Sequence, residues 1–251
     1  MNPFRQAIQI DHSHTEDWYQ ANGVYGGLVF AQIITSVREV SLFPIRRLNV
    51  DLCAPVTNVV CEIDVSESRR GTNSQFLMFT VKQLGKVVTH GTVVCGGERS
   101  KDLEIHQCAI PQPDVPTSPG IPKHPLMPAF TQHFEYWPTL GDLPFTGSQH
   151  LSTGGWIRSR HDSTLDPEMI VALLDAWWPS MSLGLRKPRP MGTISIAIDL
   201  LWQDVIEESN PCFLENTSLE VSSGYSIEHN RLWRSDGTLL AIAQQNIVLI
   251  R

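Results

Sequence analysis

The sequence predicts an α+β fold made of two tandem units, each a curved antiparallel sheet wrapped around one central helix. Three observations support this prediction. The chain has 251 residues, enough for two modest domains that each bury a core. A proline-rich stretch divides it near the middle. The segments on either side follow one plan: a leading strand, a long helix and a run of four antiparallel strands.

The dividing stretch lies between Glu98 and Phe130, where prolines recur every two or three residues from Pro111 to Pro128. Because proline fixes φ and lacks a backbone N–H, we expect neither a helix nor a central strand here. Such a stretch is typical of a semi-extended spacer. We therefore expect an N-terminal unit at 1–98, a linker at 99–130 and a C-terminal unit at 131–251 that carries the catalytic residues.

The first unit contains a predicted helix, GGLVFAQIITSVREV at residues 26–40, followed by strands. The helix is indicated by apolar residues three and four positions apart, namely Leu28, Ala31, Ile34 and Val37. Alternation and β-branched residues predict the strands, with Gly85 at the turn between the last two. These strands are expected at 46–56, 59–69, 74–85 and 86–97.

The second unit repeats this order. Opening strands are expected around HFEYWP and GGWIRSR, and a helix from about Pro167 with Asp166 as its N-cap. The cluster Ser235-Asp236-Gly237 marks the final hairpin turn, in the place that Gly85 takes in the first unit. The four closing strands are expected near 192–203, 213–224, 225–235 and 238–250.

The helix of the second unit has no polar stripe, because MIVALL is followed after one acid by Ala-Trp-Trp. A helix that is apolar on every side cannot lie on a surface and must be wrapped by other elements. A curved antiparallel sheet can enclose it. Two such units side by side form a double hotdog.

Composition excludes several classes of protein. Apolar residues make up 41% and charged residues 18% of the chain, as in a soluble globular protein, and the net charge of −7 argues against nucleic-acid binding. The N-terminus lacks the pattern of a signal peptide, and no apolar run reaches the ~20 residues of a membrane helix. We expect a cytoplasmic protein without membrane insertion.

Metal and disulfide chemistry have little support. The five cysteines are widely spaced without a CxxC pair, which predicts free thiols rather than disulfides or a zinc site. His12 and His14 could in principle hold a metal, but an isolated HxH pair near a terminus is usually solvated chain. We expect no metal and no cofactor.

The clearest candidate for chemistry is Asp175, because burying an unpaired carboxylate in an apolar helix is costly. A structural role and a catalytic one are equally compatible with the helix alone. Candidate partners lie on two later strands. Alternation places Thr193 and Ser195 on one face of the first, and Gln245 shares a face with small residues on the second. A Ser or Gln on a strand is, taken alone, more often surface.

Three segments in order, LLDAWWPS, GTISIAIDLLW and GTLLAIAQQNIVLIR, resemble the acyl-CoA thioesterase II family and the wider thioesterase-like superfamily. In the first half, NGVYGGLVFAQIITSV is similar to the family's helix opening, so the resemblance covers nearly the whole chain. It implies that the family's catalytic Asp, hydroxyl and Gln fall on Asp175, Ser195 and Gln245. The hydroxyl in the best-known members is Thr, and Thr193 offers one two residues before Ser195.

The resemblance implies hydrolysis of acyl-CoA, or of a carrier-bound acyl thioester, to free acid and thiol, as in fatty-acid and lipid metabolism. Asp175 would activate water that the hydroxyl and Gln245 position. The backbone N–H groups at Gly26 and Gly27, or the corresponding turn of the second unit, are candidate oxyanion donors. The acyl pocket is expected to be shaped by Trp178, with Trp177, Trp156 and Phe130.

Two other functions stay open. The same pocket could carry out dehydration, cyclisation or another rearrangement of an acyl or polyketide chain, because fold does not determine chemistry. A non-catalytic acyl-binding module is the third possibility. A GxSxG elbow, a GxGxxG fingerprint and a phosphate-binding GxxxxGK[ST] loop are all missing from the sequence. Association into a homo-oligomer is compatible with each of these functions.

Overall fold

The computed structural model describes residues 2–9, 16–57, 61–100, 102–111, 114–124 and 127–250. His12 and His14, considered above as metal ligands, lie outside these residues. The long strands of the described chain are β3 (Ile45–Leu52), β4 (Glu62–Arg70), β5 (Ser74–Gln83), β6 (Lys86–Gly96), β7 (Phe134–Leu140), β8 (Ser152–Ser159), β10 (Met191–Leu200), β12 (Cys212–Ser222), β13 (Tyr225–Trp233) and β14 (Leu239–Leu249).

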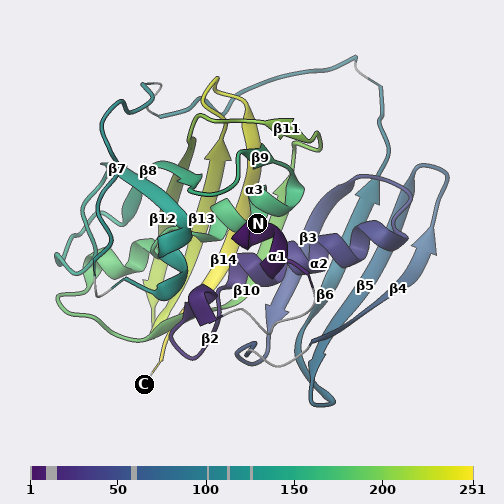
Figure 1. Ribbon diagram of the computed structural model, residues 1–251, viewed down its shortest axis with the longest axis horizontal. Helices are drawn as coiled ribbons and strands as arrows, with labels where there is room; N and C mark the ends of the chain where they lie inside the picture. The colour runs from purple at the N-terminus through teal and green to yellow at the C-terminus, as the bar shows by residue number, and fades with distance from the viewer. Residues whose placement is uncertain are drawn as a thin grey trace.

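Within the described residues these ten strands form one antiparallel sheet in the order β4-β5-β6-β3-β10-β14-β13-β12-β8-β7 (Figure 1). The two units join where β3 pairs with β10, with Leu48 opposite Ile198 and Val50 opposite Ile196. The four strands predicted after the helix of each unit and the opening strands of the second unit are therefore confirmed, and they form one continuous sheet. The leading strand expected before the first helix is absent from this sheet, and only two-residue strands precede that helix among the described residues. The short pairs are β1 (Tyr19–Gln20) with β2 (Gly23–Val24), and β9 (Thr164–Leu165) with β11 (Ile206–Glu207).

Two helices, α2 (Gly26–Val40) and α3 (Pro167–Asp175), lie on the same face of this sheet and pack against each other (Figure 1). Helix α2 has the predicted bounds, and the four apolar residues that predicted it are fully buried. Helix α3 begins as predicted, since the Asp166 carboxylate accepts a hydrogen bond of 2.9 Å from the Met169 N–H. The wrapped-helix architecture of a double hotdog is confirmed.

Helix α3 is shorter than its apolar sequence suggested, because it ends at Asp175. Proline cannot occupy a helix interior, since its ring clashes with the carbonyl four residues earlier. For Pro179 that carbonyl belongs to Asp175. The acid therefore lies at the C-terminal end of the helix, and Trp177 and Trp178 follow it in an irregular segment before the 3-10 turn η4 (Ser180–Gly184).

From Arg99 to Pro128 the proline-rich stretch has neither helix nor strand among its described residues, as expected, and the 3-10 turn η3 (Ala129–His133) follows it. It is, however, part of the fold rather than a free spacer. The indole N–H of Trp137 donates to the Ser118 carbonyl at 2.7 Å, and that of Trp233 donates to the Cys108 carbonyl at 3.1 Å. The stretch thus covers a small cluster formed by Trp137, Trp156, Phe213 and Trp233, separate from the main core.

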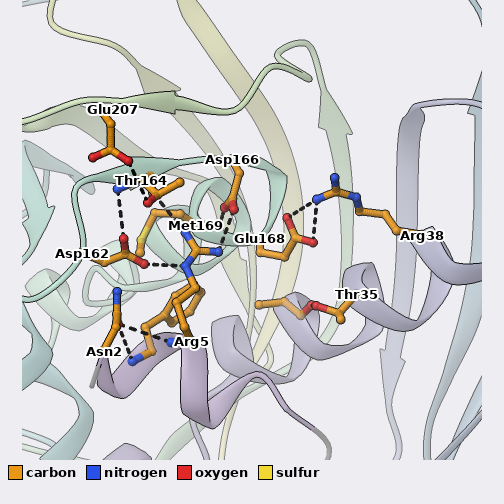
Figure 2. A network of polar contacts seen from close by, with 12 residues as sticks. Asn2, Arg5, Thr35, Arg38, Asp162, Thr164, Asp166, Glu168, Met169 and Glu207 are labelled. Atoms are coloured by element: carbon orange, nitrogen blue, oxygen red, sulfur yellow. Dashed lines mark hydrogen bonds and ion pairs between the residues drawn. The ribbon is translucent and has the colours of Figure 1, made fainter.

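Ion pairs hold the N-terminal helix α1 (Pro3–Ala7) against the second unit (Figure 2). Arg5 contacts Asp162 and Asp166, each at 2.6 Å. A second ion pair, between Arg38 of α2 and Glu168 of α3 at 2.9 Å, joins the two central helices (Figure 2). These contacts help to hold the start of α3 in place.

Two further findings bear on the expectations above. Among the helices of the described residues, none is long and apolar enough to cross a membrane. None of the cysteines there forms a disulfide, as predicted.

Candidate active site around Asp175

Asp175 lies against the N-terminal end of helix α2, where the carboxylate closely approaches two glycines. A Cβ atom on Gly26 would lie 2.8 Å from Asp175 Oδ2, so only glycine fits without displacing the acid. The backbone N–H of Gly27 is hydrogen-bonded to the carboxylate. The first N–H groups of a helix have no partner within it and carry partial positive charge, so they suit an anion.

The surroundings of Asp175 raise its pKa from 3.8 to about 7, chiefly because burial penalises the charged form. The charge of Glu228 raises the pKa further, and the Gly27 hydrogen bond opposes both effects. A carboxyl with this pKa can give up and accept a proton near neutral pH, which is the property of a general base.

Tyr25 fixes how the two helices meet. It precedes α2, its hydroxyl donates to the carbonyl oxygen of Ala172 in α3, and its ring stacks on Phe130 at 4.1 Å between centroids. A side chain on Gly27 would overlap the Tyr25 ring. Of the candidate oxyanion donors, which were Gly26 and Gly27 or the corresponding turn of the second unit, the Gly27 N–H is directed at Asp175.

A second group of polar side chains lies on the strands. The Thr193 hydroxyl donates to Gln245 Oε1 at 3.0 Å, and Gln245 Nε2 donates to Glu228 Oε1 at 2.7 Å. Glu228 is 0% exposed and Gln245 is 4% exposed. They lie directly opposite each other on β13 and β14, the strands against which α3 packs.

The expectation that Ser195 shares a face with Thr193 is wrong. The register with β14 shifts between these residues, so that Thr193 lies opposite Ile247 while Ser195 lies opposite Asn246. The extra residue of this bulge reverses the alternation. The Ser195 hydroxyl accepts from Asn246 Nδ2 at 3.0 Å, on the other side of the sheet from Gln245. The structure brings Thr193, not Ser195, to Gln245.

The predicted pocket aromatics divide between the two faces of the sheet. Trp177 and Trp178, in the segment that directly follows Asp175, both donate from their indole N–H to Thr153 Oγ1, at 3.2 and 3.1 Å. Trp156 lies instead in the separate cluster under the proline-rich stretch, so its expected place in the pocket is wrong. Its neighbour Ile157 faces the main core, and alternation turns Trp156 away.

Sequence reasoning missed Glu228 and the segment that binds it. Both the backbone N–H and the hydroxyl of Ser180 donate to Glu228 Oε2, just beyond the segment that carries Asp175. Alternation along β13 gives a misleading signal, because Tyr225 and Ile227 are apolar and would be expected to face inward. These two are exposed, and the alternate polar residues Ser226, Glu228 and Asn230 are buried.

No direct hydrogen bond joins Asp175 to Thr193 or Gln245 among the described residues. The two groups are connected by helix packing and by the electrostatic effect of Glu228 on Asp175. Asp175 thus lies near a polar chain that runs from Thr193 through Gln245 to Glu228.

The fold and this site define the class of protein: a double hotdog with an acid at the junction of its two central helices. Comparison with protein families then shows that the chain belongs to the acyl-CoA thioesterase family. The model of the acyl-CoA thioesterase C-terminal domain matches residues 109–249, and that of the N-terminal domain matches residues 14–96. No protein of curated function matches the sequence.

Solved structures share the whole fold. A conserved hot dog protein of unknown function from Alicyclobacillus acidocaldarius is 24% identical with a TM-score of 0.83, covering 100% of this chain and 99% of that one. The tesB protein of Mycobacterium avium subs paratuberculosis is 13% identical with a TM-score of 0.75, over 99% and 98% of the two chains. The acyl-CoA thioesterase II TesB2 of Mycobacterium marinum is 17% identical with a TM-score of 0.67, over 90% and 89%.

Proposed function

We propose that this protein hydrolyses acyl-CoA, or a related acyl thioester, to a free acid and a thiol, with Asp175 as the general base. The observation that carries the proposal is the Asp175 carboxyl at the end of helix α3, which has a pKa of about 7 and packs against the first residues of helix α2. The chain that holds it is a member of the acyl-CoA thioesterase family. Burial alone would keep an acid neutral. The Gly27 N–H favours the ionised form, so the acid can cycle between both states.

The reaction needs one water molecule. Asp175 accepts a proton from the water as its oxygen attacks the thioester carbonyl, and a tetrahedral intermediate forms. When the carbonyl reforms, the carbon–sulfur bond breaks and the thiolate leaves, taking up the proton from Asp175. The carboxylate is then restored. A thioester is already a good acyl donor, so no covalent nucleophile is required.

Thr193 and Gln245 position the water in this proposal. The Thr193 hydroxyl donates a hydrogen bond to Gln245 Oε1, so the lone pairs of the hydroxyl oxygen are available to accept a hydrogen bond from a water molecule. A water that donates one hydrogen to Thr193 and the other to Asp175 keeps a lone pair for the carbonyl. Ser195, on the other face of the sheet, takes no part.

The test is thiol release over short, medium, long and aromatic acyl-CoAs, with the products identified by mass spectrometry. Free acid plus thiol is expected for at least one acyl group. A product that differs from the substrate by water, or is isomeric with it, would instead support a dehydratase, cyclase or other rearrangement. Tight binding without turnover across the panel would indicate an acyl-binding module.

A further inference from the structure

Resting on the proposed hydrolysis, we infer that Glu228 is a positioning residue that sets the direction of the hydrogen bonds from Thr193 to Gln245, and thereby orients the attacking water. Glu228 touches neither Thr193 nor Asp175 through a hydrogen bond in the described residues. It acts through the side-chain amide of Gln245, which lies between Glu228 and Thr193.

Four donors converge on the two oxygens of Glu228. Oε2 accepts from the backbone N–H and the hydroxyl of Ser180, and Oε1 accepts from Gln245 Nε2 at 2.7 Å and Asn230 Nδ2 at 3.1 Å. An ionised carboxylate can only accept hydrogen bonds, so four donors match it. Burial raises the pKa of Glu228, and these hydrogen bonds oppose the rise.

This arrangement determines how the Gln245 amide is turned. The oxygen and nitrogen of an amide are nearly equal in shape, so neighbouring groups decide which end points where. With Glu228 as an acceptor, the amide NH2 faces Glu228 and Oε1 faces Thr193. The Thr193 hydroxyl must then donate to Gln245 and can accept from water.

A neutral side chain at position 228 would allow the Gln245 amide to take the opposite orientation. If Gln245 presented its NH2 to Thr193, the hydroxyl would accept from the amide and point its own hydrogen at the water. That hydrogen would occupy one of the two lone pairs of the water and leave its second hydrogen without the Thr193 acceptor, so the water would turn. The same residues would remain in place, and the nucleophile would be turned away from the substrate.

Glu228 also acts on the base by charge. The titratable groups that interact with Asp175 in the described residues are Glu228 from β13 and Tyr25 from the start of α2. The negative charge of Glu228 raises the pKa of Asp175. Neutralising Glu228 therefore moves the acid limb of the rate profile to lower pH, which loss of packing alone would not do.

The first test is Glu228→Gln, which keeps the shape and removes the charge. We expect kcat on the best acyl-CoA to fall about 10- to 100-fold, with KM changed by less than about threefold, because the orientation of the water is lost rather than substrate binding. The matched control is Ser218→Ala. Ser218 contacts the Ser180 hydroxyl at 2.7 Å in the same buried network but does not reach Gln245, so kcat and the acid limb should stay unchanged.

The second test exchanges the two groups in the double variant Glu228→Gln with Gln245→Glu. The amide at position 228 can accept from Ser180 and donate to the carboxylate at 245, which again accepts from Thr193. Asn230 Oδ1, which has no partner in the described residues, is free to accept after its amide turns. We expect the double variant to regain at least about tenfold in kcat over Glu228→Gln at the pH plateau of each.

The outcomes separate this inference from the proposed function. A wild-type protein that releases no thiol overturns the proposed function. Wild-type turnover together with an unchanged kcat and acid limb in Glu228→Gln overturns the role of Glu228 and leaves hydrolysis standing. If Glu228→Gln does not fold, the double variant decides: a kcat within about tenfold of wild type supports the inference, and a rate as low as that of Asp175→Asn contradicts it.

Discussion

The approach of Gly26 to Asp175 gives a prediction whose size follows from the structure. In Gly26→Ala the new Cβ would lie 2.8 Å from Asp175 Oδ2, whereas ordinary contact begins at about 3.4 Å. The carboxylate must therefore move by about 0.6 Å, since the methyl group is held by the helix backbone. A displacement of ~1 Å in a catalytic group can cost about 100-fold in rate, so a loss of about tenfold in kcat is expected.

Folding should not suffer from this change, because alanine favours a helix over glycine by up to ~1 kcal/mol. The assay is steady-state thiol release with a thermal melt of each variant. Gly192→Ala is the matched control: it adds the same methyl group near Thr193, where the nearest atom is Ile250 Cδ1 at 3.8 Å. Full activity in Gly26→Ala with an unchanged melting temperature would refute the claim that the position of the carboxylate matters.

Three further predictions concern the pKa of Asp175, the two hydroxyls of β10 and the ion pairs of Arg5. Because Asp175 must be ionised to accept a proton and its pKa is about 7, kcat/KM should rise with pH through an apparent pKa near 7; a flat profile between pH 5 and 9 would contradict this. Thr193→Val should lower kcat while Ser195→Ala should not, and equal losses would mean that the bulge does not separate the two hydroxyls. Arg5→Ala should lower the free energy of unfolding by about 1–3 kcal/mol in urea titration, because two buried aspartates lose their partner. The exposed Lys82→Ala is its control, with no measurable change expected.

Local signals predicted much of the fold. The spacing of Leu28, Ala31, Ile34 and Val37 identified helix α2 because these residues share one face at a period of 3.6. Asp166 capped α3 as expected, since its carboxylate needs only a nearby backbone N–H. Such features depend on a few adjacent residues. They can therefore be seen without knowing the rest of the chain.

Other features depend on register and on distant partners. Alternation placed Ser195 with Thr193 because a period of two holds only while a strand has no bulge, and the bulge follows from pairing with β14. Glu228 was missed because its buried carboxylate is stabilised by hydrogen bonds from Ser180 and Gln245, which lie far from it in sequence. The sequence and the family resemblance had already singled out Asp175 and Gln245 as candidates. Their connection through Glu228 became visible only in three dimensions.

The central claim is that Asp175 activates water, and the rate of thiol release by Asp175→Asn tests it most directly. Asn keeps the shape of Asp but cannot take up a proton, so a loss of about 1,000-fold or more in kcat is expected. A melt at pH 8 checks folding. The folded-state pKa of Asp175, about 7, lies above the ordinary 3.8, so the stability that its protonated form contributes is complete below pH 3.8 and lost as pH rises through 7. At pH 8 the neutral Asn should therefore melt no lower than wild type, and a variant that melts normally and keeps the full hydrolytic rate would contradict the assignment of Asp175 as the base.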